Sequence, residues 1–193
     1  MSNSFELHAW VDESMRPSAT DERMYLLGAV VADPSCCGQA RDELRAVLPK
    51  GAPKLHWTDM EDREKKQVTD LVTGFDMAHM VVVGMPLDHR KQEHARAKCM
   101  ERLLWEMGSM QVSRVFLEQR TPSLNKRDMR LVEHLRGSKA IPTSLRVDIE
   151  RPSTEPMLWI PDQMLGAMGD AEGEDSTWLE MYGGAVERID ITF

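Results

Sequence analysis

The chain has 193 residues and a formal net charge of −8, because 32 acidic residues outnumber 24 lysines and arginines. This length suits one domain, so we expect residues 1–193 to form a single unit rather than two. The acidic balance argues against a broad, non-specific nucleic-acid coat, which requires a basic face, although it allows a local basic groove.

The sequence also argues against secretion and membrane insertion. No run of about 18 apolar residues is present, and the first residues lack a basic start followed by an apolar run. Cys36 and Cys37 are neighbours in a chain with three cysteines and are poorly placed to bridge each other, so no disulfide framework is expected. We therefore expect a cytoplasmic protein that does not contact a membrane.

Apolar patterning predicts a first strand over residues 5–12, with apolar side chains on both faces, as in a central strand that is covered on two sides. A second apolar run, over residues 24–32, follows a polar connection and is expected to pair with the first strand in antiparallel. Further strands are predicted over residues 78–87, 112–118 and 145–150.

Helical spacing of apolar residues predicts helices between these strands. The first follows the start signal at residues 33–35, and the second begins near Thr58 or Asp59 and ends near Gly74. Later helices are expected before Gly108, after residues 121–123, around Asp162 and over residues 178–188. The order β-β-α-α-β-α-β-α-β-α predicts an α/β fold with a mixed sheet of about five strands and helices on both faces.

Three acids occupy comparable places in these elements. Asp12 ends the first strand, Glu118 ends a later strand, and Asp162 lies in the first turn of a helix. If the two strands are parallel neighbours, Asp12 and Glu118 lie side by side, since paired strands are about 4.8 Å apart. Carboxylates suit Mg²⁺ or Mn²⁺, so the three could form one metal site. Alternatively, Asp12 and Asp162 are cap or first-turn acids favoured by helix dipoles, and Glu118 is an exposed strand end.

Four segments together resemble a bacterial family called domain of unknown function 3800. They are DES at residues 12–14, YLLGAVV at 25–31, HWTDM at 56–60 and PDQMLGA at 161–167. The resemblance covers nearly the whole chain. The sequence departs from the usual family pattern at Met15, where a glycine is common, and at Pro161, where a small residue is common.

This resemblance implies a ribonuclease H-like fold of the retroviral-integrase type. It further implies that Asp12, Glu118 and Asp162 correspond to the acidic metal ligands of ribonuclease H-like nucleases. His56 and Asp59 are then expected near the site.

Other residues extend the candidate site. Asp128 is a fourth candidate metal ligand, because it occupies a core-facing helix position where an uncompensated carboxylate is costly. The alternative is that Asp128 and Asn125 satisfy backbone groups in the first turns of their helix. His56 could act as a general base or contact phosphate, or it could be a structural residue held by hydrogen bonds. Glu13 points to the strand face opposite Asp12 and is expected to support the ligands.

Basic residues supply candidate phosphate contacts. Arg120 is the best placed, because it follows Glu118 closely, and Lys126 and Arg127 are weaker candidates. A larger set of cations could form a rim that tracks phosphates, or could simply be solvated helix faces: Arg90, Lys91, Arg96, Lys98, Arg102, Lys126, Arg127 and Arg130.

These features predict a metal-dependent phosphodiesterase, and specifically a nuclease, a hydrolase that cleaves RNA or DNA. Hydrolysis would use two metal ions, Mg²⁺ or Mn²⁺, held by Asp12, Glu118 and Asp162, with Asp128 as a further candidate ligand. Two alternatives remain: a binding or regulatory module of the same fold that lacks turnover, and a small-molecule phosphohydrolase. Nucleic acid is the expected partner, and the choice between RNA and DNA and the formation of a homo-oligomer are left open.

Overall fold

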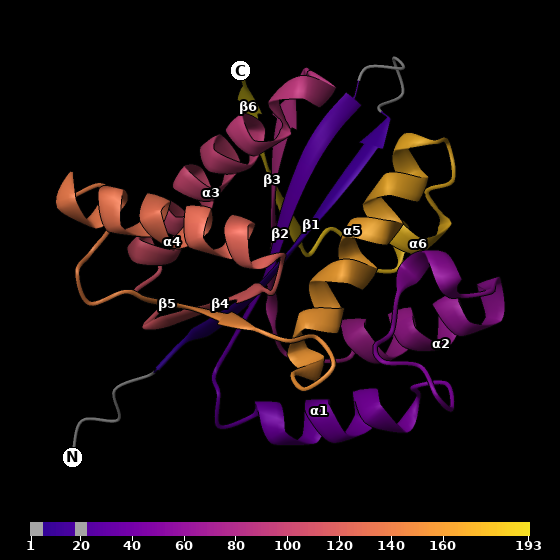
Figure 1. The fold of residues 1–193 in the computed structure, drawn as a ribbon. Coiled ribbons are helices and arrows are strands. Elements are labelled where there is room, and N and C mark those ends of the chain that lie inside the picture. The colour runs from indigo at the N-terminus through magenta and orange to yellow at the C-terminus, as the bar shows by residue number, and fades with distance from the viewer. Residues whose placement is uncertain (1–5, 18–22) are drawn as a thin grey trace.

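A computed structural model of the protein describes residues 6–17 and 23–193. Within these residues the chain forms a six-stranded mixed sheet in the order β5-β4-β1-β2-β3-β6 (Figure 1). Antiparallel pairing joins β1 to β2 and β2 to β3, whereas the other neighbouring strands are parallel. The strands are β1 (His8–Pro17), β2 (Arg23–Ala32), β3 (Ala78–Met85), β4 (Arg114–Glu118), β5 (Arg146–Glu150) and β6 (Val186–Thr192).

The central strands are buried on both faces, as their sequences predict. In β1, Trp10 belongs to the apolar core on one face of the sheet, whereas Ala9 and Val11 belong to the core on the other. β1 continues to Pro17 instead of ending at Asp12, because it remains paired with β2 after its pairing with β4 has ended at Val11. The expected end of the first strand was therefore wrong, although its antiparallel partner was correct.

Helices cover both faces of the sheet (Figure 1). One core lies between the sheet and α1, α2, α5 and α6, and the other lies between the sheet and α3 and α4. Not one of these helices, within the part of the chain that the structure describes, is long and apolar enough to cross a membrane. Their bounds, with three short 3₁₀ turns, are α1 (Cys37–Ala46), η1 (Trp57–Asp59), α2 (Asp62–Thr73), η2 (His89–Lys91), α3 (Gln92–Ser109), α4 (Pro122–Gly137), η3 (Pro156–Leu158), α5 (Trp159–Glu172) and α6 (Thr177–Glu180).

The C-terminal part of the chain differs most from the prediction. The helix expected over residues 178–188 is limited to α6, which ends at Glu180, and residues 186–192 form β6. β6 pairs in parallel with β3, and its Ile189 and Ile191 pack against the core beneath α3. The edge of β3 thus pairs with a segment for which no strand was predicted.

The start of α2 also differs from the prediction. Glu61, rather than Thr58 or Asp59, caps the helix, and its side chain forms a reciprocal capping box with Glu64. Thr58 and Asp59 instead belong to η1, immediately after His56.

Candidate active site

A polar cavity of about 270 Å³ opens beside the point where β1 and β4 stop pairing. Its lining combines side chains from β1, β4 and the turn after it, α3, α5 and the segment before η1, which are far apart in the sequence. The charged residues on the α5 side of this lining are Asp12, Lys54, His56, Glu118 and Asp162.

The parallel pairing of β1 and β4 brings Asp12 and Glu118 together. Val11 pairs with Leu117, so the next residue of each strand, Asp12 and Glu118, follows at the same level of the sheet. Both carboxylates project to the face that also carries the stacked rings of Trp10 and Phe116, since side chains alternate along a strand. The expectation that these strands are parallel neighbours is confirmed.

Asp162 reaches the cavity from the first turn of α5. Its Oδ2 accepts a hydrogen bond of 2.8 Å from the backbone N–H of Trp57, which fixes the direction of the carboxylate. Gly166 permits this approach, because a Cβ there would lie only 2.0 Å from Cγ of Trp57. Pro161 is compatible with the helix, since first-turn residues have no intrahelical N–H bond to lose.

His56 also contacts Asp162. Its Nδ1 lies 3.0 Å from Oδ1 of the carboxylate, and 42% of the imidazole is exposed to solvent. The hydrogen bond to Asp162 raises the pKa of His56 above its ordinary value, although burial acts in the opposite direction. His56 is therefore held by one ring nitrogen while the rest of the ring faces the cavity.

Lys54 is a member of this group that the sequence analysis did not predict. Its Nζ donates a hydrogen bond of 2.8 Å to Oε1 of Glu118. Burial tends to lower the pKa of Lys54, but the bond to Glu118 and the nearby acids raise it above the ordinary value. Lys54 lies two residues before His56 in an irregular segment, so the only sequence signal for it was its nearness to His56 in the chain.

The carboxylates of the site carry more negative charge than their neighbours neutralise. Asp12 is 9% exposed, and its burial raises the pKa of its carboxyl well above the usual range. The charges of Glu118 and Asp162 raise that pKa further, while Lys54 and the backbone N–H of Glu13 oppose the shift. Oε2 of Glu118 is buried and has no hydrogen-bond partner among the described residues.

On the opposite face of the sheet, Asp128 is paired with Arg96. Nε of Arg96 lies 3.0 Å and 3.1 Å from the two Asp128 oxygens, and Nη2 lies 2.8 Å from one of them. Arg96 also donates to Glu13 at 2.6 Å. The guanidinium satisfies the buried acid, so the placement of Asp128 as a fourth metal ligand is corrected. Arg96 is itself buried, at 3% exposure, and not on the solvated helix face where we expected it.

The candidate phosphate contacts are only partly brought to the cavity. Arg120 lines it, but its guanidinium is paired with Glu13 and Glu93. Lys126 and Arg127 are exposed on α4 and do not line the cavity. These three side chains therefore do not form one phosphate-binding group in this arrangement. Asn125 accepts a hydrogen bond from the backbone N–H of Arg120, so it supports the turn before α4.

The donor set suits a hard divalent cation, because three carboxylates share the cavity and one buried oxygen of Glu118 lacks a partner. Within residues 6–17 and 23–193, however, no three His, Cys, Asp or Glu side chains already have the arrangement of a metal site. Lys54 occupies one oxygen of Glu118, and His56 and Trp57 occupy those of Asp162. The carboxylate oxygens are thus suitable ligands for the ion, and its binding requires the contacts of Lys54, His56 and Trp57 with these oxygens to rearrange.

Comparisons with known proteins identify the fold. The chain is similar to the ribonuclease HII complex with PCNA from Archaeoglobus fulgidus, with a TM-score of 0.55, 11% identity and coverage of 87% of this chain and 75% of that one. It is also similar to ribonuclease H2 from Pyrococcus horikoshii OT3, with a TM-score of 0.50, 15% identity and coverage of 87% and 74%. The fold is ribonuclease H-like. At these identities the likeness concerns the fold alone, and no protein-family model and no curated protein matches the sequence.

Proposed function

We propose that this protein is a divalent-metal-dependent phosphodiesterase, and specifically a nuclease that acts on RNA or DNA. The observation that carries the proposal is the cavity at which Asp12, Glu118 and Asp162 meet, although they lie more than 40 residues apart in the sequence. Burial and the two neighbouring charges make ionised Asp12 costly there. A divalent cation would offset that cost, because its charge stabilises the ionised carboxylates.

Asp12, Glu118 and Asp162 would hold the ion, Mg²⁺ or Mn²⁺, which when bound activates a water and stabilises the leaving oxygen of an in-line displacement. Residues of the chain supply the rest. His56, fixed through Nδ1 by Asp162, presents Nε2 as a proton donor or acceptor for a phosphate oxygen at the cavity. Lys54, once released from Glu118, has an ammonium free to pair with a phosphate.

The comparisons support this proposal at the level of the fold. Both similar structures are ribonucleases, and one of them is in a complex with PCNA. A nucleic-acid partner is consistent with that fold. Cys36, Cys37 and Cys99 are free thiols, which accords with the cytoplasmic location that we include in the proposal.

The test is a cleavage assay on labelled single- and double-stranded RNA and DNA with Mg²⁺ or Mn²⁺. The parent chain should cleave at least one polymer, and Asp12→Asn should abolish cleavage without lowering the melting temperature. Asp148→Asn is a matched control: it removes one carboxylate from β5, where Asp148 pairs with Arg114 outside the cavity, and should cleave like the parent. Unchanged cleavage by the Asp12 variant would refute the proposal.

The ion pair of Lys54 with Glu118 favours a second candidate function, a binding or regulatory module without turnover. An ammonium at 2.8 Å from a carboxylate already supplies a positive charge to the acidic group, so the cavity would be stable without an ion. Such a module would bind nucleic acid in the assay above without cleaving it.

The same site could instead serve a small-molecule phosphohydrolase. Hydrolysis of free nucleotides with intact polymers would identify that activity.

A further inference from the structure

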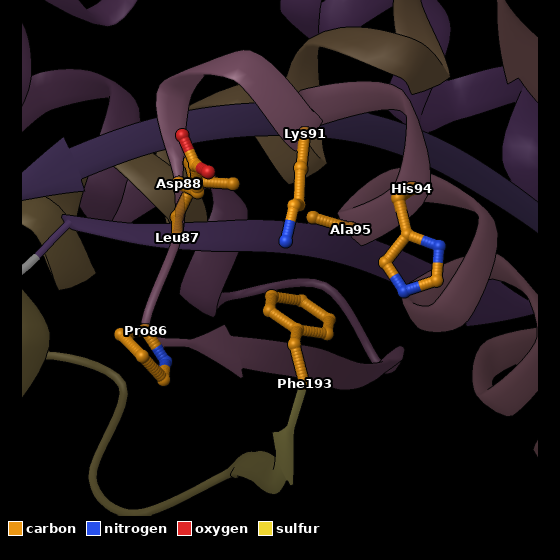
Figure 2. Close-up of a pocket in the computed structure, with 7 residues that line it drawn as sticks. All are labelled: Pro86, Leu87, Asp88, Lys91, His94, Ala95 and Phe193. Atoms are coloured by element: carbon orange, nitrogen blue, oxygen red, sulfur yellow. The ribbon is translucent and has the colours of Figure 1, made fainter.

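A second cavity, of about 710 Å³, lies beyond the C-terminal end of β3, on the side of the sheet that α3 covers (Figure 2). Leu87 and Ala95, which are buried in the core beneath α3, contribute to its apolar part. Lys91 and His94 come from η2 and α3, and Phe193 follows β6. The cavity therefore combines an apolar wall, an aromatic ring and cationic or titratable nitrogen atoms.

Phe193 is held in place as an open aromatic surface. Its backbone N–H donates to the carbonyl of Met85 at 3.4 Å, and its ring meets the His94 ring edge-on with centroids 6.4 Å apart. The ring lies directly over Gly84, where a Cβ would come within 2.0 Å of the ring atom Cζ. Glycine at this strand position thus makes room for the ring, which is still 38% exposed.

Lys91 supplies the positive charge of this cavity. Its amino group points toward the Phe193 ring (Figure 2), and no ion pair of Lys91 occurs among the residues that the structure describes. The acid in the lining is Asp88, whose carboxylate accepts a hydrogen bond from the backbone N–H of Arg90 at 2.9 Å. An anion that enters the cavity would therefore meet an available ammonium beside the aromatic face.

Both cavities include residues of α3 in their lining. Ala95 lines the second cavity, and the following residue, Arg96, lines the cavity of the three carboxylates. A strand of linked phosphates that occupies both cavities would therefore pass the first turns of α3.

We propose that the second cavity binds one nucleotide of a single-stranded nucleic acid whose backbone passes the carboxylates. The base stacks on Phe193 and its phosphate pairs with Lys91. The strand must be unpaired there, because a base enters a pocket and stacks on a side chain only after leaving its duplex. The substrate class rests on the proposed function, but the cavity itself does not.

Fluorescence anisotropy of a labelled oligothymidylate, measured in EDTA to prevent cleavage, tests the proposal. Phe193→Ala should weaken binding by roughly five- to a hundredfold, the range that the loss of one base–aromatic stack produces. Lys91→Gln should weaken binding and reduce its dependence on salt concentration, because one phosphate contact is lost. Trp105→Ala and Lys98→Gln are matched controls, since both side chains are exposed on α3 outside this cavity and should bind like the parent. Unchanged melting temperatures show that all four variants fold.

The outcomes separate this inference from the proposed function. No binding by the parent, or equal binding by the parent and the Phe193 and Lys91 variants, overturns the inference even if the parent cleaves. Selective weakening supports it even if no cleavage is seen. Thymidine monophosphate or inorganic phosphate should compete less effectively than unlabelled oligonucleotide. Equally effective competition would overturn the proposal that the cavity binds a polymer, because the cavity would then bind a small anion.

Discussion

Asp12 and Glu13 are neighbours in β1, yet they belong to opposite electrostatic surroundings. Asp12 faces α5 with Glu118 and Asp162, where the pairing cations are Lys54 and His56. Glu13 faces α3 and α4, where Arg96 and Arg120 each donate to it and also pair with Asp128. The side of Asp12, Glu118 and Asp162 has surplus negative charge, and we call it the surplus side. The side of Glu13 and Asp128 has acids that are matched by arginines, and we call it the matched side.

The difference separates charges that hold the fold from charges available for chemistry. A buried acid with an arginine partner is neutralised by the protein itself, so it has little to offer a metal ion. A buried acid beside other acids remains costly until a cation arrives. The matched side should therefore govern stability, and the surplus side should govern metal binding and activity.

The largest expected effect is on the matched side. Arg96→Met removes the guanidinium that pairs with Glu13 and Asp128, and it leaves a nearly fully buried carboxylate without that partner. We expect a loss of about 3–5 kcal/mol in the free energy of unfolding, measured by urea denaturation. A loss below about 1 kcal/mol would show that the ion pairs of Arg96 with Glu13 and Asp128 contribute little to stability.

His79 sharpens the comparison, because it is a buried titratable group with no charged partner among the residues that the structure describes. Burial lowers the pKa of His79 to about 4, and the ring packs edge-on against Tyr182. His79 therefore binds a proton below about pH 6.5 in the unfolded chain, but only below about pH 4 in the folded protein. Stability should fall by about 3 kcal/mol as pH drops across that window.

His79→Leu tests whether His79 causes this acid-dependent loss of stability. Denaturation of the parent and the variant from pH 7 to pH 4 should show the acid-dependent loss in the parent and a smaller loss in the variant. Identical profiles would assign the loss to other groups.

Lys54→Met tests whether this ammonium offsets the surplus acids. The variant should lose about 1–3 kcal/mol of stability without metal, because Glu118 loses a charged hydrogen bond. Mn²⁺ should then raise its melting temperature by more than it raises that of the parent, since the ion no longer competes with an ammonium. Differential scanning fluorimetry with and without Mn²⁺ measures both effects, and a smaller Mn²⁺ response in the variant would contradict this role.

A further effect concerns Asp12 itself. Its pKa is higher in the fold than in the unfolded chain, so the metal-free parent should lose stability as pH rises from about 4 through that raised pKa. Asp12→Asn cannot ionise and should lack this loss. Each kcal/mol recovered at neutral pH corresponds to about 2–4 °C in melting temperature for a chain of this size. A lower melting temperature for the variant than for the parent at neutral pH would show that ionised Asp12 does not destabilise the fold.

The sequence predicted the surplus side better than the matched side. Alternation in β1 and the strand-end position of Glu118 are local patterns, and parallel pairing converts them into contact. The pairing of Arg96 with Asp128 depends on how α3 and α4 pack, and neither helix pattern reveals it. Arg96 therefore looked like one more exposed cation.

Two other features escaped prediction for related reasons. Lys54 lies in an irregular segment, where no periodicity fixes the direction of a side chain. β6 is weakly patterned and pairs with the edge of β3. Short-range patterns thus specify the elements, whereas long-range contacts decide which charges remain unmatched.

The central claim is that Asp12, Glu118 and Asp162 bind a divalent cation. Isothermal titration calorimetry with Mn²⁺ on the parent, Asp12→Asn and Asp148→Asn tests it most directly, because each variant removes one carboxylate and only Asp12 lines the cavity. The parent and the Asp148 variant should bind Mn²⁺ at or below millimolar concentration, and the Asp12 variant should not. Absence of binding to the parent, or equal binding to the Asp12 variant, would contradict the account.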